Sequence, residues 1–199
     1  MKRTPLAERV LPSYTRGEEL CNMITHIVGG ALAILALVLC PIVGARHHDA
    51  YAVVSGTVYG FCMLLLYTMS SIYHGLYPRL KAKKVFQVLD HCSIFILIAG
   101  TYMPIALVPL RMYNPALGWS LFGIIWLFAL IGITLNAIDL KKYDRFSMIC
   151  YLVMGWCVVL RIDLIYRLIG PAGFALLLSG GIAYTLGAVL YALGKKRRY

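Results

Sequence analysis

Residues 70–90 read SSIYHGLYPRLKAKKVFQVLD and join two strongly apolar segments of the chain through a basic stretch. Lys and Arg are enriched in the cytoplasmic loops of membrane proteins. The stretch therefore predicts a cytoplasmic loop between two membrane-spanning helices. Ser70 and His74 come before this loop and Asp90 comes after it, so all three are expected at the same membrane face. The basic residues between them are Arg79, Lys81, Lys83 and Lys84.

The composition of the 199-residue chain agrees with a membrane protein. Hydrophobic residues make up 61%, charged residues 14%, and the mean hydropathy is +0.79, whereas soluble domains are roughly 45–50% apolar and about 25% charged. The net charge of +11 could suit nucleic acid, but in so apolar a chain the basic residues are better explained by topology. We expect the lipid bilayer as partner and no nucleic acid. The six cysteines are scattered without metal-type spacing, so no disulfide framework is predicted.

Charge-free runs long enough to cross a bilayer, about 20 residues each, predict an all-α fold. We expect a polytopic transmembrane helical bundle forming a single integral membrane domain over residues 1–199. A cytoplasmic basic arm at 1–17 would precede the first span, and no cleavable signal peptide is visible. The six predicted spans are 20–45, 51–76, 90–110, 115–138, 146–166 and 172–194.

The distribution of basic residues predicts a cytoplasmic N-terminus. With this orientation fifteen Lys and Arg residues lie inside and four, Arg46, Arg111, Arg161 and Arg167, lie outside. Within the last predicted span, Gly180, Gly187 and Gly194 recur every seven residues, and this spacing predicts a strip for close helix packing.

Ionisable groups inside membrane spans are costly and usually mark functional sites. Three predicted helices carry such groups toward the cytoplasmic side, where a common polar site is expected. The 3-4 spacing of Glu19, Asn22 and His26 puts them on one helical face. Ser70 and His74 share a face of the second helix, and Asp90 and His91 open the third.

Structural explanations exist for several of these residues. Glu19 could favour the positive end of its helix, and Asn22 or Ser70 could form interhelical hydrogen bonds. Asp90 could pair with Lys84 or cap its helix. Only one of Asp90 and His91 can point fully inward, because adjacent helical positions face about 100° apart.

Imidazole and carboxylate groups together suggest a zinc-type site, in which a carboxylate could orient a metal-bound water for hydrolysis. His74 is the best candidate ligand and Asp90 its best partner. A catalytic zinc normally has three protein ligands, so these two residues alone leave the ligand set incomplete.

Three blocks of the sequence resemble the haemolysin III family, part of the progestin and adipoQ receptor (PAQR) superfamily. They are EELCNMITHIVGG with Glu19, Asn22 and His26; SSIYHGLY with Ser70 and His74; and LDHCSIFILIAGTYMP with Asp90. The resemblance implies a seven-helix fold in the bacterial plasma membrane with a zinc ion near the cytoplasmic leaflet. By this resemblance His74 would bind zinc, Asp90 would hold the zinc-bound water, and Ser70 would support the site.

The family also places a His-x-x-x-His pair on a seventh helix, whereas this sequence ends at Tyr199. Either the chain is a truncated product of the family, or it works with six helices. The activity that the resemblance implies is metal-dependent hydrolysis of a lipid amide such as ceramide. The alternatives are a cytolytic or pore-forming haemolysin, a lipid-homeostasis protein without catalysis, and a truncated inactive family member.

Overall fold

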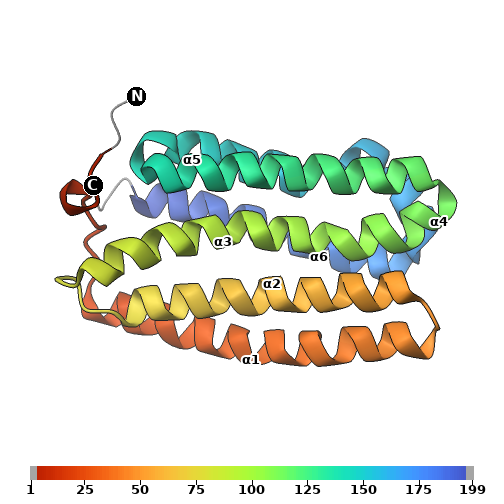
Figure 1. The fold of residues 1–199 in the computed structure, drawn as a ribbon, viewed down its shortest axis with the longest axis horizontal. Helices are drawn as coiled ribbons and strands as arrows, with labels where there is room; N and C mark the ends of the chain where they lie inside the picture. The colour runs from red at the N-terminus through yellow and green to blue at the C-terminus, as the bar shows by residue number, and fades with distance from the viewer. Residues whose placement is uncertain (1–3, 196–199) are drawn as a thin grey trace.

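A computed structural model describes residues 4–195 as an all-α bundle (Figure 1). A short 3₁₀ helix η1 (Leu6–Glu8) precedes α1 (Arg16–Arg46), α2 (Ala50–Gly75) and α3 (Lys81–Ile105). A π-helical turn η2 (Ala106–Leu110) and α4 (Arg111–Tyr113) lead into α5 (Pro115–Trp156). The 3₁₀ segment η3 (Cys157–Arg161) then leads into α6 (Ile162–Lys195).

Polar side chains fix where three of the long helices begin. Thr15 and Glu18 form a capping box at α1: the Thr15 hydroxyl accepts from the backbone amide of Glu18, and the Glu18 carboxylate accepts from the amide of Thr15 at 2.8 Å. Asp49 accepts from the amides of Tyr51 and Ala52 at the start of α2. Asn114 caps α5, where Pro115 occupies the first helical position.

Helix α5 doubles back on itself at Asp139, whose φ and ψ of −157° and 98° are not helical. The side-chain amide of Asn136 donates to the hydroxyl of Tyr151 over 3.3 Å. In a straight helix these residues would lie about 22 Å apart, at 1.5 Å per residue. The halves of α5 therefore form an antiparallel pair, seen as two adjacent helical segments at the top of Figure 1.

Helix α6 reverses at Gly170, which has a φ of +71° and a ψ of 174°. Only glycine adopts this conformation readily, because it has no Cβ. After the reversal the chain returns along α5, where the indole of Trp156 donates to the hydroxyl of Thr185 over 2.8 Å. The turn at Asp139 and the reversal at Gly170 thus define the path of α5 and α6.

Helix α3 lies at the centre of the bundle, between α2 and α5. Its Phe95 and Ala99 are fully buried and pack against α5, where Ile125, Ala129 and Met154 complete the core. Gly132 of α5 has no side chain where the Phe95 ring lies, so the two helices can approach closely at this position.

Four helical stretches among the described residues are long and apolar enough to cross a membrane: Arg16–Arg46, Ala50–Gly75, Lys81–Tyr113 and Pro115–Gly194. Large apolar side chains such as Leu32, Leu35 and Leu39 cover the outside of α1. An apolar exterior of this kind suits a hydrocarbon environment.

Two details differ from the sequence-based expectation. Asp90 does not cap its helix, because α3 begins at Lys81 and has Leu80 at the capping position. The glycine strip of α6 makes no close contact within the described part of the chain either, because a Cβ built on Gly180, Gly187 or Gly194 would meet none of its atoms within 4 Å. Spacing alone does not distinguish a contact face from a face that borders open space.

Candidate functional site

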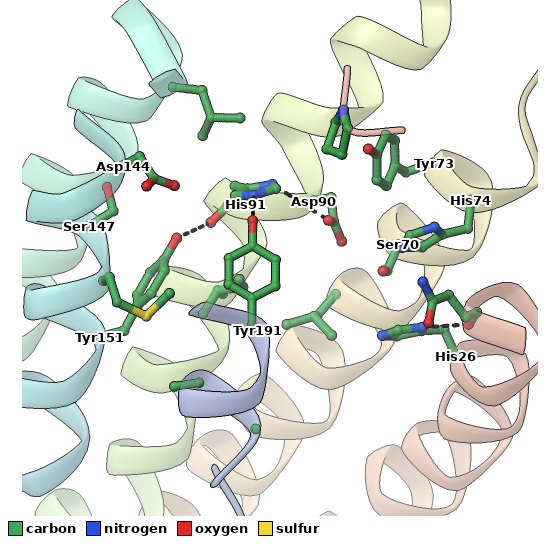
Figure 2. Close-up of a pocket in the computed structure, with 18 of the residues that line it drawn as sticks. His26, Ser70, Tyr73, His74, Asp90, His91, Asp144, Ser147, Tyr151 and Tyr191 are labelled. Carbon is green, nitrogen blue, oxygen red and sulfur yellow. Dashed lines mark hydrogen bonds and ion pairs between the residues drawn. The ribbon is translucent and has the colours of Figure 1, made fainter. Parts of the chain in front are cut away.

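A cavity of about 460 Å³ lies at the end of the bundle that holds the 76–80 loop and the Asp139 turn, which we call the loop end. Helices α1, α2 and α3 form one wall and α5 and α6 the other (Figure 2). The first wall includes six of the residues singled out from the sequence: Asn22, His26, Ser70, His74, Asp90 and His91. The three helices therefore bring six of the seven predicted polar residues to one cavity, and the seventh, Glu19, is not among its lining residues.

His74 is held by a carboxylate from another helix. Its Nδ1 lies 2.6 Å from Oε2 of Glu19 on α1. The other oxygen of Glu19, Oε1, lies 2.8 Å from Nζ of Lys83 on α3. Glu19 therefore joins an imidazole that lines the cavity to an ammonium group on a third helix.

Lys83 is only 2% exposed. Its Nζ donates to the carbonyl oxygens of Tyr73 at 3.0 Å and Leu76 at 2.9 Å, in addition to its contact with Glu19. Both carbonyls belong to the C-terminal turn of α2, where helical partners are missing. The three protons of the ammonium group thus meet three acceptors, and the residue joins α1, α2 and α3 beside His74.

The other two histidines of the cavity obtain their Nδ1 acceptor from their own helix. Nδ1 of His26 donates to the Asn22 carbonyl at 2.6 Å, and Nδ1 of His91 donates to the Gln87 carbonyl at 2.9 Å. The His26 ring stacks on that of His74, with centroids 6.0 Å apart. Each of the three imidazoles therefore has its Nδ1 occupied.

Asp90 and Ser70 lie between the histidines. Oδ2 of Asp90 is 3.6 Å from Nδ1 of His91, and the Ser70 side chain is 3% exposed. Figure 2 shows Ser70 and His74 on one side of the cavity and His91 on the other, with Asp90 between them.

The wall from α5 and α6 was not foreseen from the sequence. Tyr151 donates its hydroxyl to the His91 carbonyl at 2.8 Å, and the hydroxyl of Tyr191 lies 3.4 Å from Nε2 of His91. Asp144 and Ser147 line the same side, and Ser147 donates to the Asn136 side chain over 2.6 Å. These residues lie in apolar or loop sequence whose neighbours become apparent only after α5 and α6 fold back.

The N-terminal arm lies across the mouth of this cavity. Pro12 and Tyr14 are among its lining residues, and the Tyr14 ring meets that of His74 edge-on at 5.6 Å. The arm is attached at the Asp139 turn, where Thr4 donates its amide and hydroxyl to the Asp139 carboxylate. There Arg9 also donates to the Ile138 carbonyl at 2.8 Å.

A second cavity of about 620 Å³ extends from the first toward the opposite end of the bundle. It is lined mainly by apolar residues of α3, η3 and α6, and it shares four lining residues with the polar cavity: His26, Leu66, Ile94 and Tyr184. The two cavities are therefore neighbours, one polar and one apolar.

The described residues do not form a complete metal site. Among residues 4–195 no group of three or more His, Cys, Asp and Glu side chains is arranged to hold a metal ion. His74 has one ring nitrogen committed to Glu19, so only its Nε2 remains for a ligand. This donor set falls short of the three protein ligands of a catalytic zinc.

Comparison with known proteins gives consistent matches over nearly the whole chain. Residues 14–198 match the family described as "Haemolysin-III related". The chain is 42% identical over 174 residues to "Hemolysin-3" of Bacillus cereus, covering 87% of this chain and 78% of that protein. It is 40% identical over 178 residues to "Hemolysin-3 homolog" of Bacillus subtilis (strain 168), covering 89% and 82%. No solved structure is significantly similar to it.

Proposed function

The chain belongs to the haemolysin-III related family. From this premise we propose that it is an integral membrane protein with a lipid-binding site. The polar group of the lipid would bind in the polar cavity at the loop end. In this proposal each half of α5 and the segment of α6 after Gly170 cross the bilayer separately. Together with α1, α2 and α3 this gives six crossings. The loop end faces the cytoplasm, an orientation supported by the excess of Lys and Arg in the loops on that side.

The observation that carries the proposal is the pair of adjoining cavities, one polar and one apolar. A lipid is divided in the same way, into a polar group and an apolar acyl chain. Its polar group would lie among His74, Asp90 and Ser70, and its acyl chain would extend past Leu66 and Ile94 between α3 and α6. Binding sites of this kind combine an apolar lining with a few polar groups that fix orientation.

The chemistry that these side chains support is hydrolysis of an amide or ester bond at the polar group. Asp90 would accept a proton from an attacking water, as a positioned carboxylate does in general base catalysis. Ser70 would hydrogen-bond the carbonyl oxygen, and His74 would provide a second polar contact through Nε2. His26, His91 and Asn22 would complete the polar surroundings.

Zinc is the metal that the family resemblance implies, and His74 and Asp90 are the residues that would meet it. Because the described donors are too few, we derive no step through the metal. Metal analysis of the purified protein tests the assignment. We expect the wild type to contain well below one zinc ion per chain. We expect His74→Ala to contain still less. Equal zinc content in both proteins would show that His74 does not bind the metal.

The hydrolase proposal is tested with a fluorescent ceramide in nanodiscs containing the purified protein. We expect hydrolysis by the wild type and a loss of about 100-fold or more in Asp90→Asn, the size typical of a lost general base. Asp163→Asn serves as the matched control, because Asp163 is exposed in the first turn of α6 and lines neither cavity. Equal rates in wild type and Asp90→Asn would reject Asp90 as the base, and binding without hydrolysis would favour a lipid-homeostasis protein without catalysis.

A cytolytic function is the second candidate, supported by the names of the two Bacillus relatives. It predicts that protein added to dye-loaded liposomes releases the dye in proportion to protein concentration. Intact liposomes at all concentrations would reject it.

A further inference from the structure

We propose that Glu19 and Lys83 form a positioning pair that fixes the tautomer and orientation of His74, so that its Nε2 lone pair faces the cavity. This inference rests on the proposed function and deepens it, since it assigns His74 the form in which it would meet the polar group of a lipid. Neither residue needs to touch the ligand. Both act through the imidazole.

The tautomer follows from the acceptor at Nδ1. A carboxylate oxygen has no proton to donate, so a distance of 2.6 Å between Oε2 of Glu19 and Nδ1 of His74 requires the proton on Nδ1. In the neutral ring Nε2 is then unprotonated. His74 lines the cavity, and Nε2 is the ring nitrogen left to act there as a proton acceptor or ligand.

The ammonium group of Lys83 stabilises the half-buried Glu19 carboxylate, which accepts the Nδ1 proton of His74. A carboxylate removed from water is costly unless it is paired and hydrogen-bonded. The ammonium group 2.8 Å from Oε1 provides the partner charge. Its two bonds to the α2 carbonyls hold it at the turn that follows His74. Both oxygens of the Glu19 carboxylate are therefore paired, and the side chain is held in place.

The neighbouring histidines supply a contrast within the same cavity. His26 and His91 have Nδ1 bonded to a backbone carbonyl four residues earlier, an acceptor supplied by any helix. Only His74, among these three, depends on side chains from two other helices. Removal of the pair should therefore alter His74 and leave the other two unchanged.

The test uses ¹⁵N-histidine-labelled full-length protein in nanodiscs without lipid substrate, because the ¹⁵N shifts of an imidazole report which nitrogen carries the proton. The His74 signals are identified by their loss in His74→Gln. Lys83→Met alone would leave the half-buried Glu19 carboxylate without its cationic partner and endanger folding. The informative variant is therefore Glu19→Leu/Lys83→Met, which removes both charges together. Lys81→Met is the matched control, because Lys81 is exposed at the start of the same helix.

We expect wild type and Lys81→Met to give His74 a protonated Nδ1 and an unprotonated Nε2 at alkaline pH. In the double variant this signature should be lost for His74 while His26 and His91 keep theirs. An unchanged His74 signal in the double variant would overturn the proposal. A change in all three histidines would overturn it as well, because the pair would then maintain general packing. The readout needs no turnover, so failure of the ceramide assay would reject the hydrolase and not this assignment.

Discussion

Glycine has opposite roles between α1 and α2 and on α6. Along the α1–α2 seam, a Cβ on Gly60 would lie against the backbone of Leu37, and one on Gly44 would lie 2.6 Å from the amide nitrogen of Val53. On α6, Gly180 and Gly187 face open space and line the two cavities. The α1–α2 pair is therefore a closely packed scaffold that fixes His26, Ser70 and His74. Helix α6 borders the space in which a ligand can lie.

The sharpest test of this contrast is Gly60→Ala. The added methyl group would push against backbone atoms of α1, which cannot move aside as a flexible side chain could. Overpacking of this kind costs about 1–3 kcal/mol, and we expect a loss near the upper end. The measurement is reversible unfolding of the protein in mixed micelles.

Gly180→Ala is the matched control for Gly60→Ala, because the same methyl group enters open space on α6. Alanine favours the helix by up to about 1 kcal/mol over glycine, so unchanged or slightly higher stability is expected. An equal loss of unfolding free energy in Gly60→Ala and Gly180→Ala would show that the two glycines do not differ in packing.

Gly170→Ala separates backbone conformation from crowding. No atom lies within 4 Å of a Cβ at this position, but φ is +71°. The expected loss of about 1–2 kcal/mol would therefore come from the strained backbone alone. It is measured by the same unfolding experiment, and a stability equal to that of wild type would mean that the reversal in α6 does not need glycine.

The sequence predicts the first half of the site better than the second, for physical reasons. Glu19, His74 and Asp90 are polar groups at the ends of apolar runs, where burial is costly, so their place is visible from hydropathy. The charged residues after 138 likewise predict a break in the helix, and the non-helical residue of α5 is Asp139.

Other features depend on contacts between distant segments. Lys83 belongs to a basic run, and the sequence places it in a loop. In the structure it is buried on α3, where Glu19 and two α2 carbonyls surround its ammonium group. Tyr151 and Tyr191 reach His91 only after α5 and α6 reverse. The period of Gly180 and Gly187 is the same whether a helix or a cavity lies opposite.

A smaller effect is expected at the attachment of the N-terminal arm. Asp139→Ala removes the acceptor for the amide and hydroxyl of Thr4 and for the amide of Lys142, and each lost hydrogen bond costs about 1 kcal/mol. The bundle should stay folded while the arm detaches more often. Arg9, 8% exposed in the attached arm, should then be cut several-fold faster by trypsin, as read by mass spectrometry. Asp163→Ala is the control at the far end of the fold, and equal cleavage in both variants would show that Asp139 does not hold the arm.

The smallest effect on stability, and the most informative about the open face, is expected for Gly187→Leu. A Cβ at this exposed position meets no atom of the described residues within 4 Å, so the free energy of unfolding should stay within about 0.5 kcal/mol of wild type, as for surface changes. Gly187 lines the polar cavity, however, and the leucine would occupy volume that a lipid needs there. Binding of a fluorescent ceramide should therefore weaken about tenfold or more, whereas Gly123→Leu, which enters open space on α5 outside this cavity, should leave binding unchanged. Wild-type affinity in Gly187→Leu would mean that the lipid does not contact this face of α6. The open space beside Gly180 and Gly187 would then need another explanation.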